Sequence, residues 1–156
     1  MIRLPGWSSL LLLATQALAQ GTGAQHSIIQ LRLARETPKS GFVLTKSVAD
    51  SNFYVAPAAI VDDADILEAR TTSSTDGCVL TIRLSARAAA RLNEVTKAHI
   101  GERLAVFIND QLNGAGVIRE QLHLGVESKV NVAVHLPKAA ADQFASAVAA
   151  RWAATH

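Results

Sequence analysis

Histidine is the residue type best suited to metal binding and to proton transfer near neutral pH, and the chain contains five histidines. They are His26, His99, His123, His135 and His156. None lies four residues from another on a predicted helix, and no His-x-x-x-His or Cys/His pair occurs, so a zinc site would need residues far apart in the sequence. His99 ends a predicted helix, where a charged imidazole stabilises the helix dipole. The sequence therefore predicts neither a metal nor a cofactor.

Nucleophilic catalysis has no recognisable motif in the sequence either. Cys78 is the single cysteine, and it lies in an apolar strand pattern without a nearby base, which predicts a buried structural thiol. No Gly-x-Ser-x-Gly sequence is present, and Gly114-Ala115-Gly116 lacks the third glycine of a dinucleotide-binding loop. We therefore expect a protein that is not an enzyme. A hydrolase whose site is assembled from distant residues is an alternative that stays open.

A cluster of acidic residues, Asp62, Asp63 and Asp65, is the other feature that suggests a metal site. A calcium loop of the EF-hand type needs oxygen ligands at five or more set positions and a closing glutamate, and that spacing is absent. Aspartate is also common at turns and at helix starts, where its side chain caps free backbone N–H groups. We interpret these three residues as capping residues.

The first residues have the pattern of an export signal. Arg3 precedes an apolar stretch, and residues 17–19 have the small-x-small form of a signal-peptidase site, so we predict cleavage after Ala19. Residues 20–26 would then be a flexible tail and residues 27–156 a single domain, with no membrane-spanning segment in the mature chain. Such a protein would be periplasmic or secreted. The formal charge of the whole chain is +2, which argues against nucleic acid as a partner.

The elements around residues 85–120 are the best defined. Ser85 is a suitable N-cap for a helix with an apolar stripe at Ala88 or Ala89, Leu92, Val95 and Ile100. Gly101 can close that helix, and the five apolar residues 104–108 predict a central strand. Two turns are then possible, Asn109-Asp110 and Asn113-Gly114. By local chemistry alone, Asn113-Gly114 is the stronger hairpin signal.

The remaining pattern completes an α+β fold. Strands are predicted over residues 29–33, 42–46, 52–55, 66–73, 79–84, 117–121 and 130–136, with a connection over residues 57–65. A closing helix begins at Pro137 and carries Ala140, Phe144, Val148 and Trp152 on one face. We therefore predict a two-layer sandwich, a mainly antiparallel sheet with two helices on one face.

Residues 92–122 resemble the head of the first periplasmic domain of SecD, an accessory subunit of bacterial protein export. The positions in register with the family pattern are Val95-Thr96, Ile100-Gly101, Leu104-Ala105-Val106, Ala115 and Val117-Ile118. The chain departs from that pattern at His99, at Asn109-Asp110, at Gly114-Ala115-Gly116 and at Gly125. The resemblance extends over residues 27–150, and its register places the hairpin turn at Asn109-Asp110, with Gly114 and Gly116 forming a bulge or bend in the second strand. The resemblance implies a head-like fold that binds polypeptide. The membrane helices that drive SecD have no counterpart in the predicted mature chain.

Together, these features predict an exported, non-catalytic protein-binding module whose partner is a polypeptide. Its expected role is accessory to protein export or to polypeptide handling in the cell envelope. We expect the partner to bind the hairpin region, at Asn109, Asp110, Asn113, Gly114, Gly116, Arg119 and Glu120. The alternative is a small envelope inhibitor or immunity-type protein that binds one specific partner.

Overall fold

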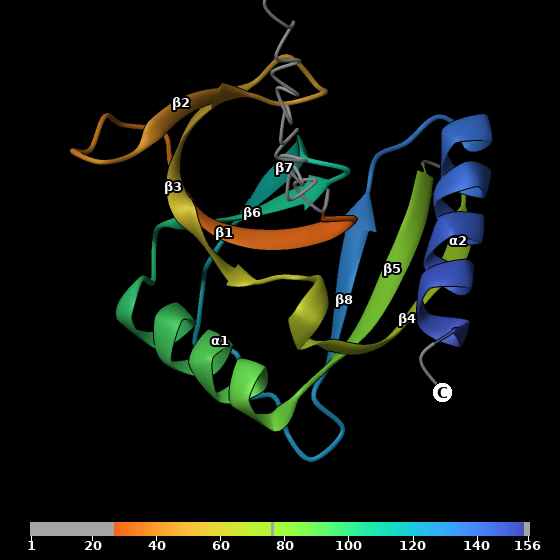
Figure 1. Cartoon of the computed structure of the whole chain (residues 1–156). Helices are drawn as coiled ribbons and strands as arrows, with labels where there is room; N and C mark the ends of the chain where they lie inside the picture. The colour runs from red at the N-terminus through yellow and green to blue at the C-terminus, as the bar shows by residue number, and fades with distance from the viewer. Residues whose placement is uncertain (1–26, 76, 155–156) are drawn as a thin grey trace, which may run out of the picture.

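The computed structural model describes residues 27–75 and 77–154, so the predicted leader and tail lie outside the described residues. The described strands form two antiparallel sheets (Figure 1). The large sheet contains, in spatial order, β2 (Val43–Lys46), β3 (Asn52–Val61), β1 (Ile29–Arg35), β6 (Arg103–Ile108) and β7 (Gln111–Val117). The small sheet contains β4 (Ile66–Ser74), β5 (Gly77–Leu84) and β8 (Lys129–Val134).

The two α-helices occupy different places against these sheets. Helix α1 (Ala86–Ala98) packs against β3 and β5, and α2 (Lys138–Ala153) packs against β4 and β5. Figure 1 shows β1 crossing the direction of β5 and β8, with α1 below the large sheet and α2 beside the small one. The α+β class, the antiparallel pairing and the two helices are confirmed. What the sequence pattern did not reveal is the division of the strands between two sheets.

Helix α1 begins and ends much as the sequence predicts. The Ser85 hydroxyl accepts a hydrogen bond from the Ala88 N–H at 3.2 Å, which satisfies one of the free N–H groups of the first turn. Gly101 adopts a φ of 91°, a left-handed conformation that favours glycine. Ile100 differs from the prediction, because the helix ends at Ala98 and the Ile100 side chain is 57% exposed.

Helix α2 lacks a side-chain cap and is held by its buried face. Pro137 is its N-cap residue, and Phe144, Val148 and Trp152 are buried against the small sheet. The indole N–H of Trp152 donates to the carbonyl of Ile66 at 3.0 Å. Trp152 is therefore a core residue, as the sequence predicts.

Strand β3 is longer than the sequence indicates. It continues through Pro57 to Val61, where a connection was expected. The pairing of β3 with β1 is irregular around Pro57, because Ala34 lies opposite Val55 whereas Arg32 lies opposite Ala59. A proline lacks the N–H that a regular ladder needs, and the bulge removes that requirement.

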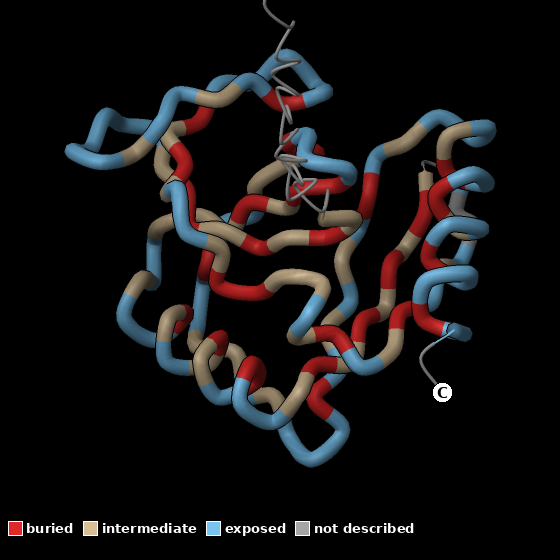
Figure 2. The backbone as a smooth tube through the Cα atoms, in the orientation of Figure 1, coloured by how far each residue is buried: buried red, intermediate tan, exposed pale blue. Residues whose placement is uncertain are grey.

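The buried residues form two clusters. The main cluster fills the space between the two sheets and the helices, and Figure 2 shows buried positions gathered along their facing sides. Cys78 belongs to it and is buried, as expected. A smaller cluster lies around Phe53, Phe107 and Leu112 of the large sheet.

The acidic cluster lies where the chain passes from the large sheet to the small one. Asp62 caps a short 3₁₀ helix (Asp63–Asp65) with a reciprocal capping box, which confirms the capping interpretation. The Asp63 carboxylate accepts from the backbone N–H groups of Ile28 and Ile29, both at 2.8 Å. We call residues 62–66, with their partners, the β3–β4 joint.

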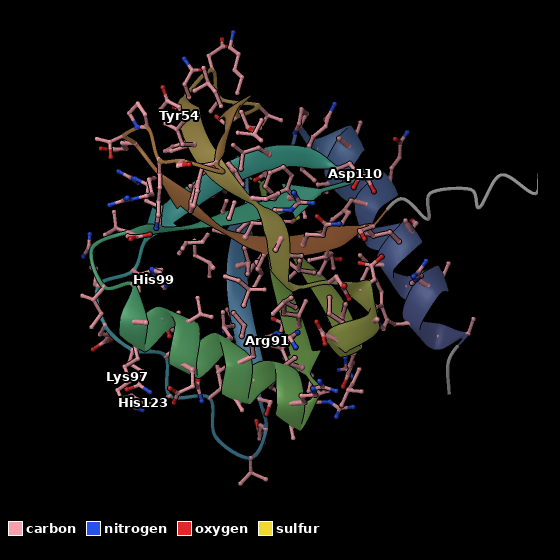
Figure 3. The ribbon with its side chains drawn as sticks, turned by 60° about the vertical axis from the view of Figure 1, so that its left-hand side comes forward. Tyr54, Arg91, Lys97, His99, Asp110 and His123 are labelled. Carbon is pink, nitrogen blue, oxygen red and sulfur yellow. The ribbon has the colours of Figure 1, made fainter. Side chains whose placement is uncertain are left out.

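Arg91 of α1 connects the helix to this joint. Its Nε donates to the carbonyl of Ile60 at 2.7 Å, and its terminal nitrogen lies 2.6 Å from the Asp65 carboxylate. Figure 3 shows Arg91 pointing from α1 toward the neighbouring strands. Asp63 and Asp65 therefore connect the joint to the start of β1 and to α1, whereas Asp62 caps the short helix locally.

Candidate functional site

Two sheet edges face each other across a groove. Among the described strands, β7 pairs only with β6 and β8 pairs only with β5, so each strand ends its sheet. A cavity of about 560 Å³ lies between them and is lined by residues of both. We call it the β7–β8 groove. Because an unpaired edge presents free backbone N–H and C=O groups, the groove offers hydrogen bonds as well as apolar surface.

The walls of the groove are mainly apolar. Leu104 and Val106 of β6 contribute from the large sheet, and Val130 and Val132 of β8 contribute from the small one. All four side chains are only partly buried, although they pack against the main cluster. Exposed apolar surface of this kind is stabilised when another apolar group covers it.

The turn and the bulge of the β6–β7 hairpin shape one side of the groove. Asn109 and Asp110 form the two-residue turn, with φ angles of 49° and 63°, and Figure 3 shows Asp110 at the end of the hairpin. Gly114 lies opposite Val106 while Leu112 lies opposite Phe107, which leaves Asn113 as the extra residue of a β-bulge. The predicted turn is therefore confirmed, whereas the bulge predicted at Gly114 and Gly116 lies at Asn113, next to Gly114, and Gly116 pairs regularly with Leu104.

Asn113 closes one end of the groove. Its side chain is buried, and its amide nitrogen donates to the His135 carbonyl at 3.1 Å. Its amide oxygen accepts from the His135 N–H at 3.0 Å. The amide thus imitates the pairing of a neighbouring strand and connects the two sheets through one side chain.

This contact also shows which backbone groups face the groove. Residues two apart on an antiparallel strand direct their N–H and C=O groups to the same side. Since His135 directs both groups toward Asn113, Ala133 and Asn131 present theirs along the same edge of β8. Both residues line the groove.

The loop over residues 118–128 closes the other end and is held by α1. The Thr96 hydroxyl accepts from the Leu122 N–H at 3.0 Å, and the Asn93 side chain accepts from the Leu124 N–H at 3.1 Å. Arg119 and Glu120 are exposed at the start of this loop and line the groove. One positive and one negative charge therefore stand at this end.

The structure separates the seven predicted site residues into two groups. Asn113, Gly114, Gly116, Arg119 and Glu120 line the β7–β8 groove. The turn residues Asn109 and Asp110 are exposed and do not line it. The prediction of all seven as one binding surface remains untested.

Sequence reasoning did not include the other wall of the groove. This second wall belongs to β8 and lies across the groove from β7. Its lining residues are Val130, Asn131, Val132 and Ala133. The alternation of valines predicts a half-buried strand but does not say which strand lies beside it. Only the sheet order identifies β8 as the second edge.

Two side chains with a shifted pKa, Glu68 and Cys78, lie away from this groove. Hydrogen bonding to Arg83, followed by the charge of Arg70, lowers the pKa of Glu68, and burial raises the pKa of the Cys78 thiol. Neither residue lines the groove. Figure 3 places His99 and His123 near the C-terminal end of α1.

Two features that often mark a functional site do not occur in the described part of the chain. Within residues 27–75 and 77–154, no group of three His, Cys, Asp or Glu residues is arranged to hold a metal ion. None of the helices in the same ranges is long and apolar enough to cross a membrane. The β7–β8 groove is the candidate site because it combines apolar walls with two free sheet edges.

The family of the chain is identified by a match over most of its length. The profile of the family described as "SecDF, P1 head subdomain" matches residues 42–150, more than half of the chain. The chain belongs to this SecDF head family. The resemblance seen in the sequence is thereby confirmed, and the matched region begins at residue 42 instead of residue 27.

Solved structures of SecDF have the same fold. One, described as "Crystal structure of SecDF in Super-membrane-facing form", has a TM-score of 0.57 and 20% identity, covering 78% of this chain and 18% of that chain. Another, described as "Structure and function of a membrane component SecDF that enhances protein export", has a TM-score of 0.54 and 19% identity, covering 92% of this chain and 70% of that chain. This chain therefore spans less than a fifth of the first SecDF chain. No curated protein matches it.

Proposed function

We propose that this SecDF head relative is an exported, non-catalytic module that binds an extended segment of another polypeptide in the β7–β8 groove. The observation that carries the proposal is the combination of an apolar groove with two free sheet edges. An extended polypeptide has both features that such a site requires, unpaired backbone groups and apolar side chains. A solved relative is described as a component that enhances protein export, which supports an export substrate as the partner.

The dimensions of the groove favour one extended segment over a folded partner. Strand β8 has six residues, so its edge is about 20 Å long at the usual rise of a strand. A stable complex of two folded proteins buries about 800 Å² on each partner, a broad surface and not a single short edge. We therefore expect affinity of about micromolar strength and rapid exchange, as suits transient handling of a polypeptide.

Export of the chain is the second part of the proposal. The leader over residues 1–19 would be removed after Ala19 and would place the module in the periplasm or outside the cell. Mass spectrometry of the protein purified from the envelope fraction should then give the mass of a chain that begins at Gln20. An intact Met1 end on the envelope form would contradict this part.

Binding can be tested with a labelled exported protein in its permanently unfolded and its folded forms. Fluorescence anisotropy should show binding of the unfolded form alone. Val132→Lys places a charge on the wall of the groove and should weaken binding about tenfold or more, because the ammonium group must be desolvated. Val126→Lys is the matched control, since Val126 is fully exposed outside the groove and should leave affinity unchanged.

The outcomes distinguish the proposal from its alternatives. Equal binding by Val132→Lys and the wild type would place the binding surface elsewhere. Selective nanomolar binding of one folded protein would support the inhibitor or immunity-type function instead. Absence of any binding to the unfolded form would reject the proposal.

A further inference from the structure

We propose that Gly114 and Gly116 determine which segments the groove accepts, because their missing side chains leave the space for bulky apolar side chains of the bound polypeptide. The inference rests on the proposed function and adds the chemical class of the segment. The bound segment is an extended, uncharged stretch with large apolar residues at alternate positions.

Neither glycine is required by the backbone. The φ angles of Gly41, Gly77 and Gly101 are positive, whereas those of Gly114 and Gly116 are not. Glycine within a strand weakens it, because it loses more conformational freedom on folding and packs no side chain. A residue type that lowers stability without a conformational need points to another use of the position.

Neither glycine is required by close packing. A Cβ atom at Gly77 would overlap the carbonyl oxygen of Val134, so that glycine is sterically fixed. A Cβ atom at Gly114 or Gly116 would have no heavy atom within 4 Å. The fold itself would therefore accept a side chain at both positions.

The absent side chains would point into the β7–β8 groove. Gly114 pairs with Val106 and Gly116 pairs with Leu104, and directly paired residues of an antiparallel ladder project to the same face. Val106 and Leu104 both line the groove. The two glycines therefore leave these side chains uncovered and deepen the groove beside them.

The spacing of the glycines defines the pattern of the segment. Residues two apart on one strand project to the same face about 7 Å apart, so the groove offers two neighbouring spaces at that separation. An extended segment that pairs with the free edge of β8 has the same repeat, and its alternate side chains can enter both spaces. The segment therefore carries large apolar residues at positions i and i+2.

The charges around the groove argue for an uncharged segment. Its walls are mainly apolar, and the exposed charges at its loop end, Arg119 and Glu120, are of opposite sign. A segment with strong net charge gains nothing from such a pair and would have to desolvate its own charges against the valines of β8. A neutral, apolar stretch complements this surface best.

The experiment measures preference for side-chain size. The probes are two fluorescein-labelled nine-residue peptides of Ser and Thr, one with Leu and one with Ala at positions 4 and 6. The wild type should bind the Leu peptide about tenfold or more tightly than the Ala peptide. Gly116→Val should abolish or reverse this preference, because the valine occupies the space that Leu would enter. Gly114→Ala should reduce it by a smaller factor.

Gly125→Val supplies the matched control. Gly125 also has an ordinary φ and open space around its Cβ position, but it does not line the groove. This variant should keep the wild-type preference. Circular dichroism and the thermal midpoint verify folding, and the midpoint of Gly116→Val should equal or exceed that of the wild type because valine favours strands.

The results separate the two levels of the proposal. If the wild type prefers Leu and Gly116→Val keeps that preference, the role of the glycines is overturned while binding in the groove stands. If the wild type binds neither peptide and no unfolded protein, the proposed function itself is rejected. If Gly125→Val alters the preference as strongly as Gly116→Val, the effect does not arise in the groove and the inference is also rejected.

Discussion

The two places where the large and small sheets approach each other are built in opposite ways. The β3–β4 joint is crossed by several side chains, among them Asp63, Arg91 and Trp152, each of which hydrogen bonds to backbone of another segment. The β7–β8 groove is crossed by Asn113 and is otherwise open between the strands. The difference suggests that the joint fixes the angle between the sheets, whereas the groove remains free for a ligand.

Trp152→Ala should have the largest effect on stability. The variant loses a large buried side chain and the hydrogen bond to the Ile66 carbonyl, and it leaves a cavity between α2 and β4. We expect the free energy of unfolding to fall by about 3–5 kcal/mol, measured by urea denaturation. Trp152→Phe retains most of the apolar contact and should lose about 1–2 kcal/mol. Equal losses for the two variants would mean that the hydrogen bond, and not packing, holds α2.

Asp63→Ala should follow closely. Its side chain is 6% exposed, and its removal leaves the N–H groups of Ile28 and Ile29 without their acceptor. We expect the free energy of unfolding, measured by urea denaturation, to fall by about 3 kcal/mol, because hydrogen bonds to a charged acceptor are stronger than hydrogen bonds between neutral groups.

Asp62→Ala provides the comparison within the same joint. It removes the N-cap of a short 3₁₀ helix and should cost about 1 kcal/mol. A larger loss for Asp62→Ala than for Asp63→Ala would show that the local cap, and not the connection to β1, stabilises the joint.

Asn113→Ala tests the groove side and should have a moderate effect. It removes two hydrogen bonds to His135 and should lower the free energy of unfolding by about 1–2 kcal/mol. The more specific readout is hydrogen exchange of the His135 amide, which should become much faster while the amides of β5 change little. Uniform acceleration across both sheets would instead mean that Asn113 supports the whole fold.

Much of this architecture could be predicted from the sequence, because local chemistry determines it. Ser85 caps its helix and Trp152 is buried, since each position depends on residues close in sequence or on one periodic pattern. The turn at Asn109-Asp110 follows from the register of the family resemblance, because local chemistry alone favours Asn113-Gly114. Strand ends were less certain: β3 passes Pro57, and β7 ends at Val117 instead of residue 121.

The groove could be predicted only in part. The hairpin sequence identified Gly114, Gly116 and the residues after them, since glycines inside a strand are unusual. Val130 and Val132 could not be assigned to the same site, because a two-residue period shows that one face of a strand is buried and not which strand is its neighbour. The second wall depends on the order of strands in two sheets, which is set by contacts far apart in the sequence.

The smallest expected effect concerns pH and belongs to the joint side of the comparison. Glu68 follows the joint on β4, and its hydrogen bond to Arg83 and the charge of Arg70 lower its pKa below the ordinary value of 4.5. Because the folded state favours the ionised carboxylate, the stabilisation is present above about pH 4.5 and is lost as the pH falls through the lower folded pKa. The free energy of unfolding of Glu68→Gln should therefore be lower than that of the wild type above pH 4.5, and the difference between the two proteins should shrink as the pH is lowered below 4.5. Acid titrations followed by circular dichroism measure this difference. If the stability difference between Glu68→Gln and the wild type grew on acidification, Glu68 would be better stabilised in its protonated form. Peptide binding in the groove should be the same in the variant and the wild type at neutral pH, because Glu68 does not line the groove.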